Sequence, residues 1–80
     1  MDDEDIVRQI NRLVEEEHDL ERAHPGVPRT PEEEERLRWI NVALDQCWDL
    51  LRQRRALRLA GQNPDEAVIR PPTIVESYRQ

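Results

Sequence analysis

The stretch TPEEEERLRWINVALDQCWDLLRQRRALRLAG, Thr30–Gly61, decides the fold of this 80-residue chain. It opens with a helix start signal, because Thr30 suits the N-cap, Pro31 suits the first helical position and Glu33 completes a capping box. No Gly or Pro follows until Gly61, which is well placed to end a helix. We therefore predict one helix of roughly 30 residues, about 45 Å long at 1.5 Å per residue.

A shorter helix is predicted before it, from about Asp3 to Ala23. Its apolar residues recur at spacings of three and four, which draws a single helical stripe: Ile6, Val7, Ile10, Leu13, Val14 and Leu20. The sequence HPGVP that follows disfavours helix, because the residue before a proline avoids the helical region and Gly26 comes next. A linker of only about six residues favours an antiparallel pair of helices.

The fold class predicted is therefore all-α, an antiparallel two-helix hairpin with a long second helix. Residues 1–61 form the hairpin and residues 62–80 form a short C-terminal tail. Asn63 and Thr73 each precede a short segment that could be a capped helical turn, Thr73 with Glu76 in a capping box. Because a chain of this length buries a limited core, association of two hairpins into a four-helix arrangement stays open.

The long helix carries two apolar stripes that lie side by side. The main stripe comprises Leu37, Ile40, Leu44, Cys47, Trp48 and Leu51, and the second comprises Trp39, Ala43, Leu50 and Leu57. Together they span about half of the helix circumference, which is more than one neighbouring helix covers. We expect the second stripe to be covered by the tail, through Ile74, Val75 and Tyr78, by a second copy, or by another protein.

The charges predict how the hairpin closes. An antiparallel register places Ile10 near Leu44 and Leu13 near Ile40. Beyond Leu51 the main stripe stops being apolar, and its positions are taken by Arg54, Arg55 and Arg58. Asp2 and Asp3 lie at the matching end of the first helix. We predict an electrostatic clamp there, which sets register and orientation more than it adds stability.

Composition excludes several classes of function. The net charge is −6 and the pI is near 4.8, which disfavours direct binding of nucleic acid or of an anionic membrane. There is no apolar run long enough to span a bilayer, and the start MDDED is acidic where a secretory signal is basic. A single cysteine, Cys47, forms no intrachain disulfide. These features point to the cytoplasm.

We find no pattern typical of an enzyme and expect no cofactor. Ser77 is the one serine, no Gly-rich phosphate loop occurs, and Cys47 on the main stripe is predicted to be a buried, inert thiol. Four residues near the predicted loop resemble a carboxylate metal set, namely Glu17, Glu21, His24 and Glu33. His24 lies at a helix end beside Pro25, however, and Arg29 and Arg36 are close enough to neutralise the carboxylates. We therefore predict no metal site.

The function predicted is protein–protein interaction by a small cytosolic adaptor or regulatory protein, which is not an enzyme. The candidate interaction residues are Trp39, Leu50, Leu57, Arg52, Arg54, Arg55 and Arg58. The partner is expected to be a second copy or another protein. One alternative is an acidic regulator of a nucleic-acid-handling partner, and a metal-binding helical bundle is a weaker one.

The chain also resembles a known family. The stretch ALDQCWDLLRQRRALRLAGQNPDEAVIRPPTIVESY, together with the start MDDEDIVRQINRLVEEEH, is similar to a family of small actinobacterial proteins of unknown function. The resemblance covers nearly the whole chain apart from the loop around Pro25–Arg29, and LDQCWDLLRQRR is its most specific string. It implies a bacterial cytosolic helical protein and brings no activity, cofactor or catalytic residue.

Overall fold

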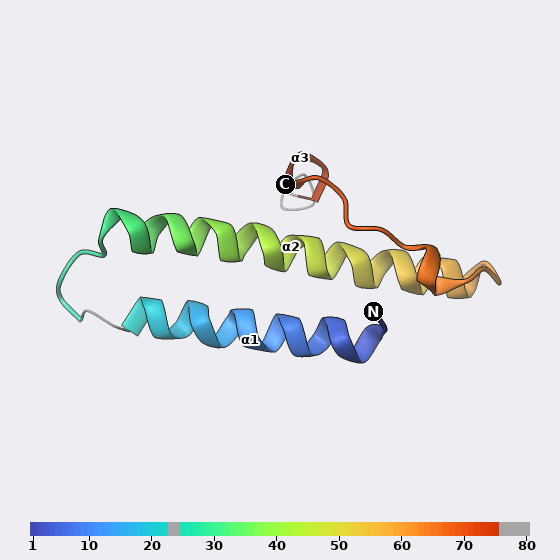
Figure 1. The fold of residues 1–80 in the computed structure, drawn as a ribbon, viewed down its shortest axis with the longest axis horizontal. Coiled ribbons are helices and arrows are strands. Elements are labelled where there is room, and N and C mark those ends of the chain that lie inside the picture. Colours follow the sequence, from blue (N-terminus) through green and yellow to red (C-terminus); the bar gives the residue numbers. More distant parts are fainter. Residues whose placement is uncertain (23–24, 76–80) are drawn as a thin grey trace.

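The computed structural model of the chain describes residues 1–22 and 25–75, with side chains up to residue 73. Two long helices, α1 (Asp3–Arg22) and α2 (Pro31–Leu59), are followed by a 3-10 turn η1 (Pro64–Glu66) and a single-turn helix α3 (Pro72–Val75). The long helices run antiparallel, joined at one end by the loop (Figure 1). The predicted all-α hairpin is therefore confirmed, and no strand occurs in the described ranges. Ala23, the predicted last residue of the first helix, lies outside them.

Helix α2 begins and ends as its sequence predicts. The Thr30 hydroxyl accepts a hydrogen bond from the Glu33 amide at 3.2 Å, and the Glu33 carboxylate accepts one from the Thr30 amide at 2.9 Å. At the other end Gly61 has φ +74°, a left-handed conformation that glycine adopts without strain. The amide of Gly61 donates to the carbonyl of Arg58, which closes the last turn.

Helix α1 is fixed at its start by two aspartates. The Asp2 carboxylate accepts a hydrogen bond from the Asp5 amide at 2.9 Å, and the Asp5 carboxylate accepts one from the Asp2 amide at 3.1 Å. The bond from the Asp2 amide, assisted by Arg8, lowers the pKa of Asp5. The acidic start therefore caps the helix as well as complementing its dipole.

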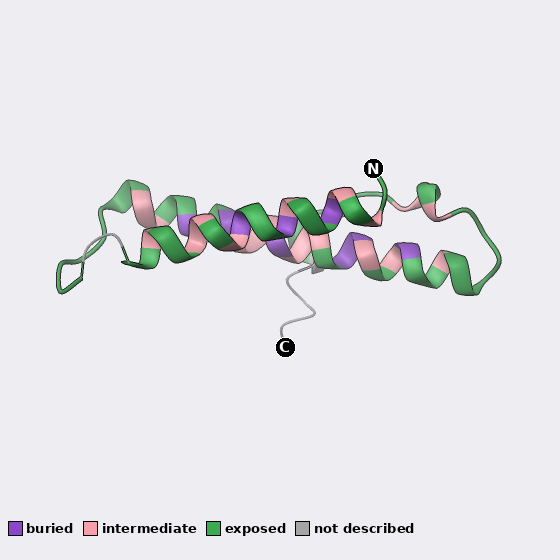
Figure 2. Cartoon of the chain, turned by 90° about the horizontal axis from the view of Figure 1, so that it is seen from below, coloured by how far each residue is buried: buried purple, intermediate pink, exposed green. Residues whose placement is uncertain are grey.

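The core lies along the line where α1 faces α2 (Figure 2). Its buried apolar residues are Ile6, Ile10 and Leu13 of α1 with Leu37, Ile40, Leu44 and Leu50 of α2. The main stripe is thus confirmed at Leu37, Ile40 and Leu44. The prediction that Trp48 is core is wrong, since its side chain is 48% exposed. Trp48 lies at the edge of the apolar arc, where α1 is too narrow to cover an indole.

The tail lies against the side of α2 that faces away from α1 (Figure 1). Asn63 caps η1, because its side-chain oxygen accepts a hydrogen bond from the Asp65 amide at 3.0 Å. Ala67 packs against the hydrophobic core. Helix α3 begins at Pro72, one residue before the predicted cap Thr73. The remaining predictions for the tail concern the side chains of Ile74, Val75, Glu76, Ser77 and Tyr78, which lie outside what is described.

Candidate interaction surface

Charged side chains clamp the open end of the hairpin. Arg54, which is buried, donates from Nε to Asp3 of α1 and from an Nη to Asp65 of η1 at 3.0 Å. Arg58 donates to the same Asp3 carboxylate. One aspartate and one arginine thereby join three elements of the chain. The predicted contact between the Arg-rich end of α2 and the start of α1 is confirmed for Asp3, Arg54 and Arg58.

The clamp divides the predicted basic residues into two groups. Hydrogen bonds from Arg58 and Arg54 lower the pKa of Asp3, and the bond to Asp3 raises the pKa of Arg54, so this network stays ionised. Arg54 is therefore an internal structural residue, and its proposed role in partner binding is wrong. Arg52 and Arg55, in contrast, are exposed. Asp2 caps α1 and its carboxylate binds the Asp5 amide.

A second polar network holds the tail to α2. Asp49 is fully buried and accepts hydrogen bonds from Arg70, one of them from Nε at 2.9 Å. Gln53 donates to Asp49 at 2.9 Å and to the carbonyl of Val68 at 2.6 Å. Gln46 donates to the carbonyl of Arg70 at 3.1 Å. Polar groups on the back of α2 thus hold residues 68–70 by side chain and backbone together.

The Asp49–Arg70 pair was not predicted from the sequence. The hydrogen bond from Arg70 lowers the pKa of Asp49 against the opposing effect of burial, so the carboxylate is ionised although its side chain has no exposed surface. Such a buried charge needs a partner, because an unpaired one is costly. Two features of the sequence could have indicated this pair. Arg70 is an isolated arginine in the tail, and Asp49 lies on the side of α2 opposite the main stripe.

The second apolar stripe is only partly covered. Leu50 is buried against the core, where Met1 and Ala67 lie beside it. Of the three covers that the sequence leaves open for this stripe, the tail is therefore the one found at Leu50, so Leu50 is not exposed to a partner. Leu57 is half-buried. The tail does reach this stripe, and it does so through Ala67.

Trp39, on the same stripe, is 51% exposed and lies under a charged group. The Arg36 guanidinium is 4.3 Å from the centre of the Trp39 ring, a cation–π contact. The same guanidinium donates to Glu16 of α1, and that bond raises the pKa of Arg36 and lowers the pKa of Glu16. Trp39 thus packs against the ion pair that crosses the hairpin near its loop.

An apolar strip lies along the other broad side of the hairpin, which we call the open side. Residues at 100° intervals on two antiparallel helices place four side chains there: Val7 and Val14 of α1 with Trp48 and Leu51 of α2. Val7 is 44% exposed and Trp48 is 48% exposed. Val14 and Leu51 pack at the edge of the core. Residues 67–70 contact the opposite broad side and the back of α2.

A cavity of about 260 Å³ lies on the side that the tail covers. Its lining is mostly apolar: Met1, Ile6, Gln9, Ala43, Gln46, Cys47, Leu50 and Ile69. Cys47 is half-buried there and not fully buried as predicted. Its partial burial raises the pKa of the thiol, so the reactive thiolate is disfavoured.

Neither a metal-binding cluster nor a membrane-spanning helix occurs among the described residues. Within residues 1–22 and 25–75 no three His, Cys, Asp or Glu side chains are grouped so that they could hold a metal ion. Glu17, Glu21 and Glu33 belong to those ranges, whereas His24 lies outside them. None of the helices in the same ranges is long and apolar enough to cross a bilayer.

The geometry defines a class of protein, a small helical hairpin with a clamped end and a tail held on the back of its long helix. The chain belongs to the family described as "Protein of unknown function (DUF2630)", whose model matches residues 2–80. It is similar to uncharacterized proteins of Mycobacterium bovis and Mycobacterium tuberculosis, each 50% identical over 78 residues. Those 78 residues cover 95% of this chain and 88% of each relative. No solved structure matches the chain.

Proposed function

We propose that this chain is a cytoplasmic protein-interaction module that binds its partner through the open side. The observation that carries the proposal is Trp48, an indole that is half-exposed within an apolar strip. Tryptophan is enriched among the residues that dominate binding energies, because it offers a large apolar surface and a single polar group. The strip continues through Leu51 into the edge of the core, so a partner would extend an existing apolar contact.

The Arg-rich end of α2 supplies the charged border of this surface. Arg55 is exposed beyond Trp48, whereas Arg54 and Arg58 are bonded to Asp3. An outward-pointing arginine suits an acidic group on a protein partner. A nucleic-acid surface, in contrast, gathers many phosphate contacts. An adaptor or regulatory role, without catalysis, is the function that agrees with these features.

The experiment compares the two exposed tryptophans, which are matched in exposure and differ in location. A photoreactive phenylalanine analogue replaces either Trp48 or Trp39 in the full chain, expressed in its native host. We expect cross-linked protein adducts from position 48 and few from position 39, because Trp39 packs under Arg36. Equal cross-linking at both positions, or cross-linking at position 39 alone, would place the interaction surface elsewhere.

A further inference from the structure

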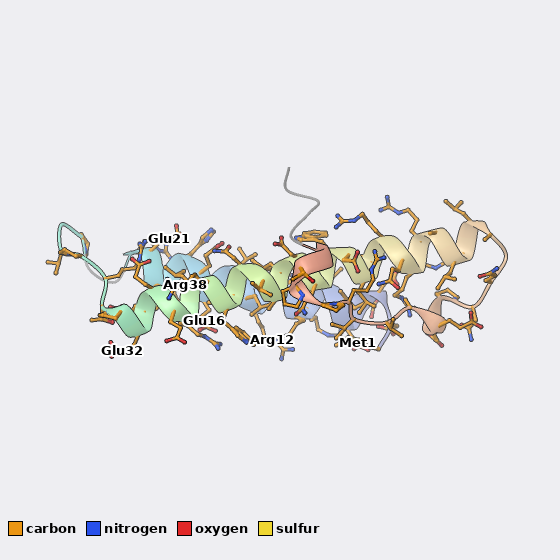
Figure 3. The ribbon with its side chains drawn as sticks, turned by 90° about the horizontal axis from the view of Figure 1, so that it is seen from above. Met1, Arg12, Glu16, Glu21, Glu32 and Arg38 are labelled. Atoms are coloured by element: carbon orange, nitrogen blue, oxygen red, sulfur yellow. The ribbon has the colours of Figure 1, made fainter. Side chains whose placement is uncertain are left out.

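The open side carries opposite charges at its two ends. Near the loop α2 presents Glu34, whose carboxylate is held by Arg29 at 3.0 Å. The loop end as a whole is rich in acids, and Glu16, Glu21 and Glu32 lie there (Figure 3). At the far end Arg54 and Arg58 are bonded to Asp3, whereas Arg55, which comes two turns after Trp48 and so lies on the same side of α2, is exposed. Glu34 and Arg55 therefore place opposite charges at the two ends of α2 on this side.

These charges lie symmetrically about the centre of α2. Arg55 comes eleven residues after Leu44 and Glu34 comes ten residues before it. At 1.5 Å per residue both lie about 15 Å from the level of Leu44. A two-fold axis at that level would therefore bring Arg55 of one molecule beside Glu34 of another, twice. Such self-complementarity is what a two-fold homodimer requires.

We propose that the partner of the open side is a second copy of this chain, bound antiparallel about a two-fold axis near Leu44. The inference rests on the function proposed above and names its partner. Trp48 of each molecule then lies at the level of Asn41 and Val14 of the other. Each indole thus covers the apolar strip of the other molecule, and the four long helices pack together. The two Arg55–Glu34 pairs lie at the two ends of this contact.

The charge pattern also decides how two copies would be oriented. A parallel dimer would place Glu34 against Glu34 and Arg55 against Arg55. The charge pattern therefore selects the antiparallel arrangement, although two copies of net charge −6 repel at long range.

Charge reversal in a mixing experiment tests the proposal. Arg55→Glu and Glu34→Arg each place like charges together twice in a homodimer, so each variant alone should dimerise at least about tenfold more weakly. In an equal mixture of the two variants, the new glutamate at position 55 of the first variant faces the new arginine at position 34 of the second. At the other end of the dimer the native Glu34 of the first variant faces the native Arg55 of the second. We expect the mixture to recover a heterodimer of near wild-type affinity. Sedimentation equilibrium gives the affinities, and native mass spectrometry identifies the mixed species.

Two control variants change the net charge by the same amount, but at positions that lie outside the open side. Arg12→Glu matches Arg55→Glu, and Glu32→Arg matches Glu34→Arg, since Arg12 and Glu32 are exposed on other faces. We expect neither control to change the dimer affinity more than about twofold. Circular dichroism of each variant verifies that the helices are intact.

Three results would overturn the proposal. The wild-type chain could remain monomeric at every concentration up to the millimolar range. Alternatively, a dimer could form that the reversals at 55 and 34 leave unchanged, or the single variants could weaken the dimer without recovery on mixing. If the wild type is monomeric while position 48 still cross-links to a different protein, the second copy is excluded and the interaction module stands. If position 48 gives no adduct and no dimer forms, both proposals fail.

Discussion

Replacing Ile40 by alanine tests whether the hairpin depends on the contact between α1 and the middle of α2. Ile40 is fully buried and belongs to the cluster that includes Ile6, Ile10 and Leu13 of α1. Large-to-small changes at such sites cost about 2–5 kcal/mol, because apolar contacts are lost and a cavity remains. A domain of this length is stabilised by roughly 4–12 kcal/mol. We therefore expect Ile40→Ala to remove a large part of the free energy of unfolding.

The assay is urea unfolding followed both by circular dichroism and by tryptophan fluorescence, so that coincident curves verify two-state behaviour. Leu59→Ala is the matched control, because Leu59 lies on the same helix and is 83% exposed. It should change the free energy of unfolding by less than about 0.5 kcal/mol. If Ile40→Ala does not fold, Ile40→Val, with an expected loss of about 0.5–1.5 kcal/mol, keeps the test open. Equal effects of the changes at 40 and 59 would refute the assigned core.

Three further predictions concern the polar networks and the tail. Asp3→Asn should lower the melting temperature in a thermal scan more than Asp2→Asn does, because asparagine still caps α1 whereas the clamp loses its charge; equal shifts would contradict the clamp. Arg70→Ala should cost about 1–2 kcal/mol at neutral pH. The pKa of Asp49 is lowered in the folded state, so this difference in the free energy of unfolding is fully present above the usual aspartate pKa near 4. It shrinks as the pH falls through the lower pKa that Asp49 has in the folded protein. Urea unfolding of both proteins at a series of pH values measures it. A difference independent of pH would show that Arg70 acts without Asp49. Truncation after Gly61 should uncover Leu50 and raise the binding of an apolar-surface dye; unchanged dye fluorescence would show that Ala67 does not cover it.

The helices and the core register could be predicted because their signals are local. The Thr30–Glu33 capping box and Gly61 define the ends of α2 through residues next to each other in sequence. Spacings of three and four identify the stripe that contains Ile40, and the charges beyond it predict the contact of Arg54 with Asp3. Each of these inferences needs only helix geometry and an antiparallel partner.

The surface was harder to predict because it depends on packing between distant segments. Periodicity places Trp48 and Leu50 in the apolar arc of α2, but which edge of that arc is covered depends on where the tail runs. The tail position is fixed by Asp49 and Arg70, which are 21 residues apart. Nothing in their immediate neighbours marks them as a pair. Consequently Trp48, which the pattern places in the core, is half-exposed, whereas Leu50, for which the pattern leaves the cover open, is buried under the tail.

The arrangement of α1 and the tail on different sides of α2 has a consequence for how the molecule opens. Both segments dock on one central helix, and the tail is held chiefly by polar contacts around Asp49, whereas α1 is held by the apolar core. Segments with little buried apolar contact open at lower free energy than the rest of a protein. Amide protons of residues 67–70 should therefore exchange with solvent long before those of Ile40 and its neighbours, as a separate cooperative unit. The hairpin itself, built from contacts between adjacent helices, is the kind of topology that forms rapidly and precedes attachment of the tail.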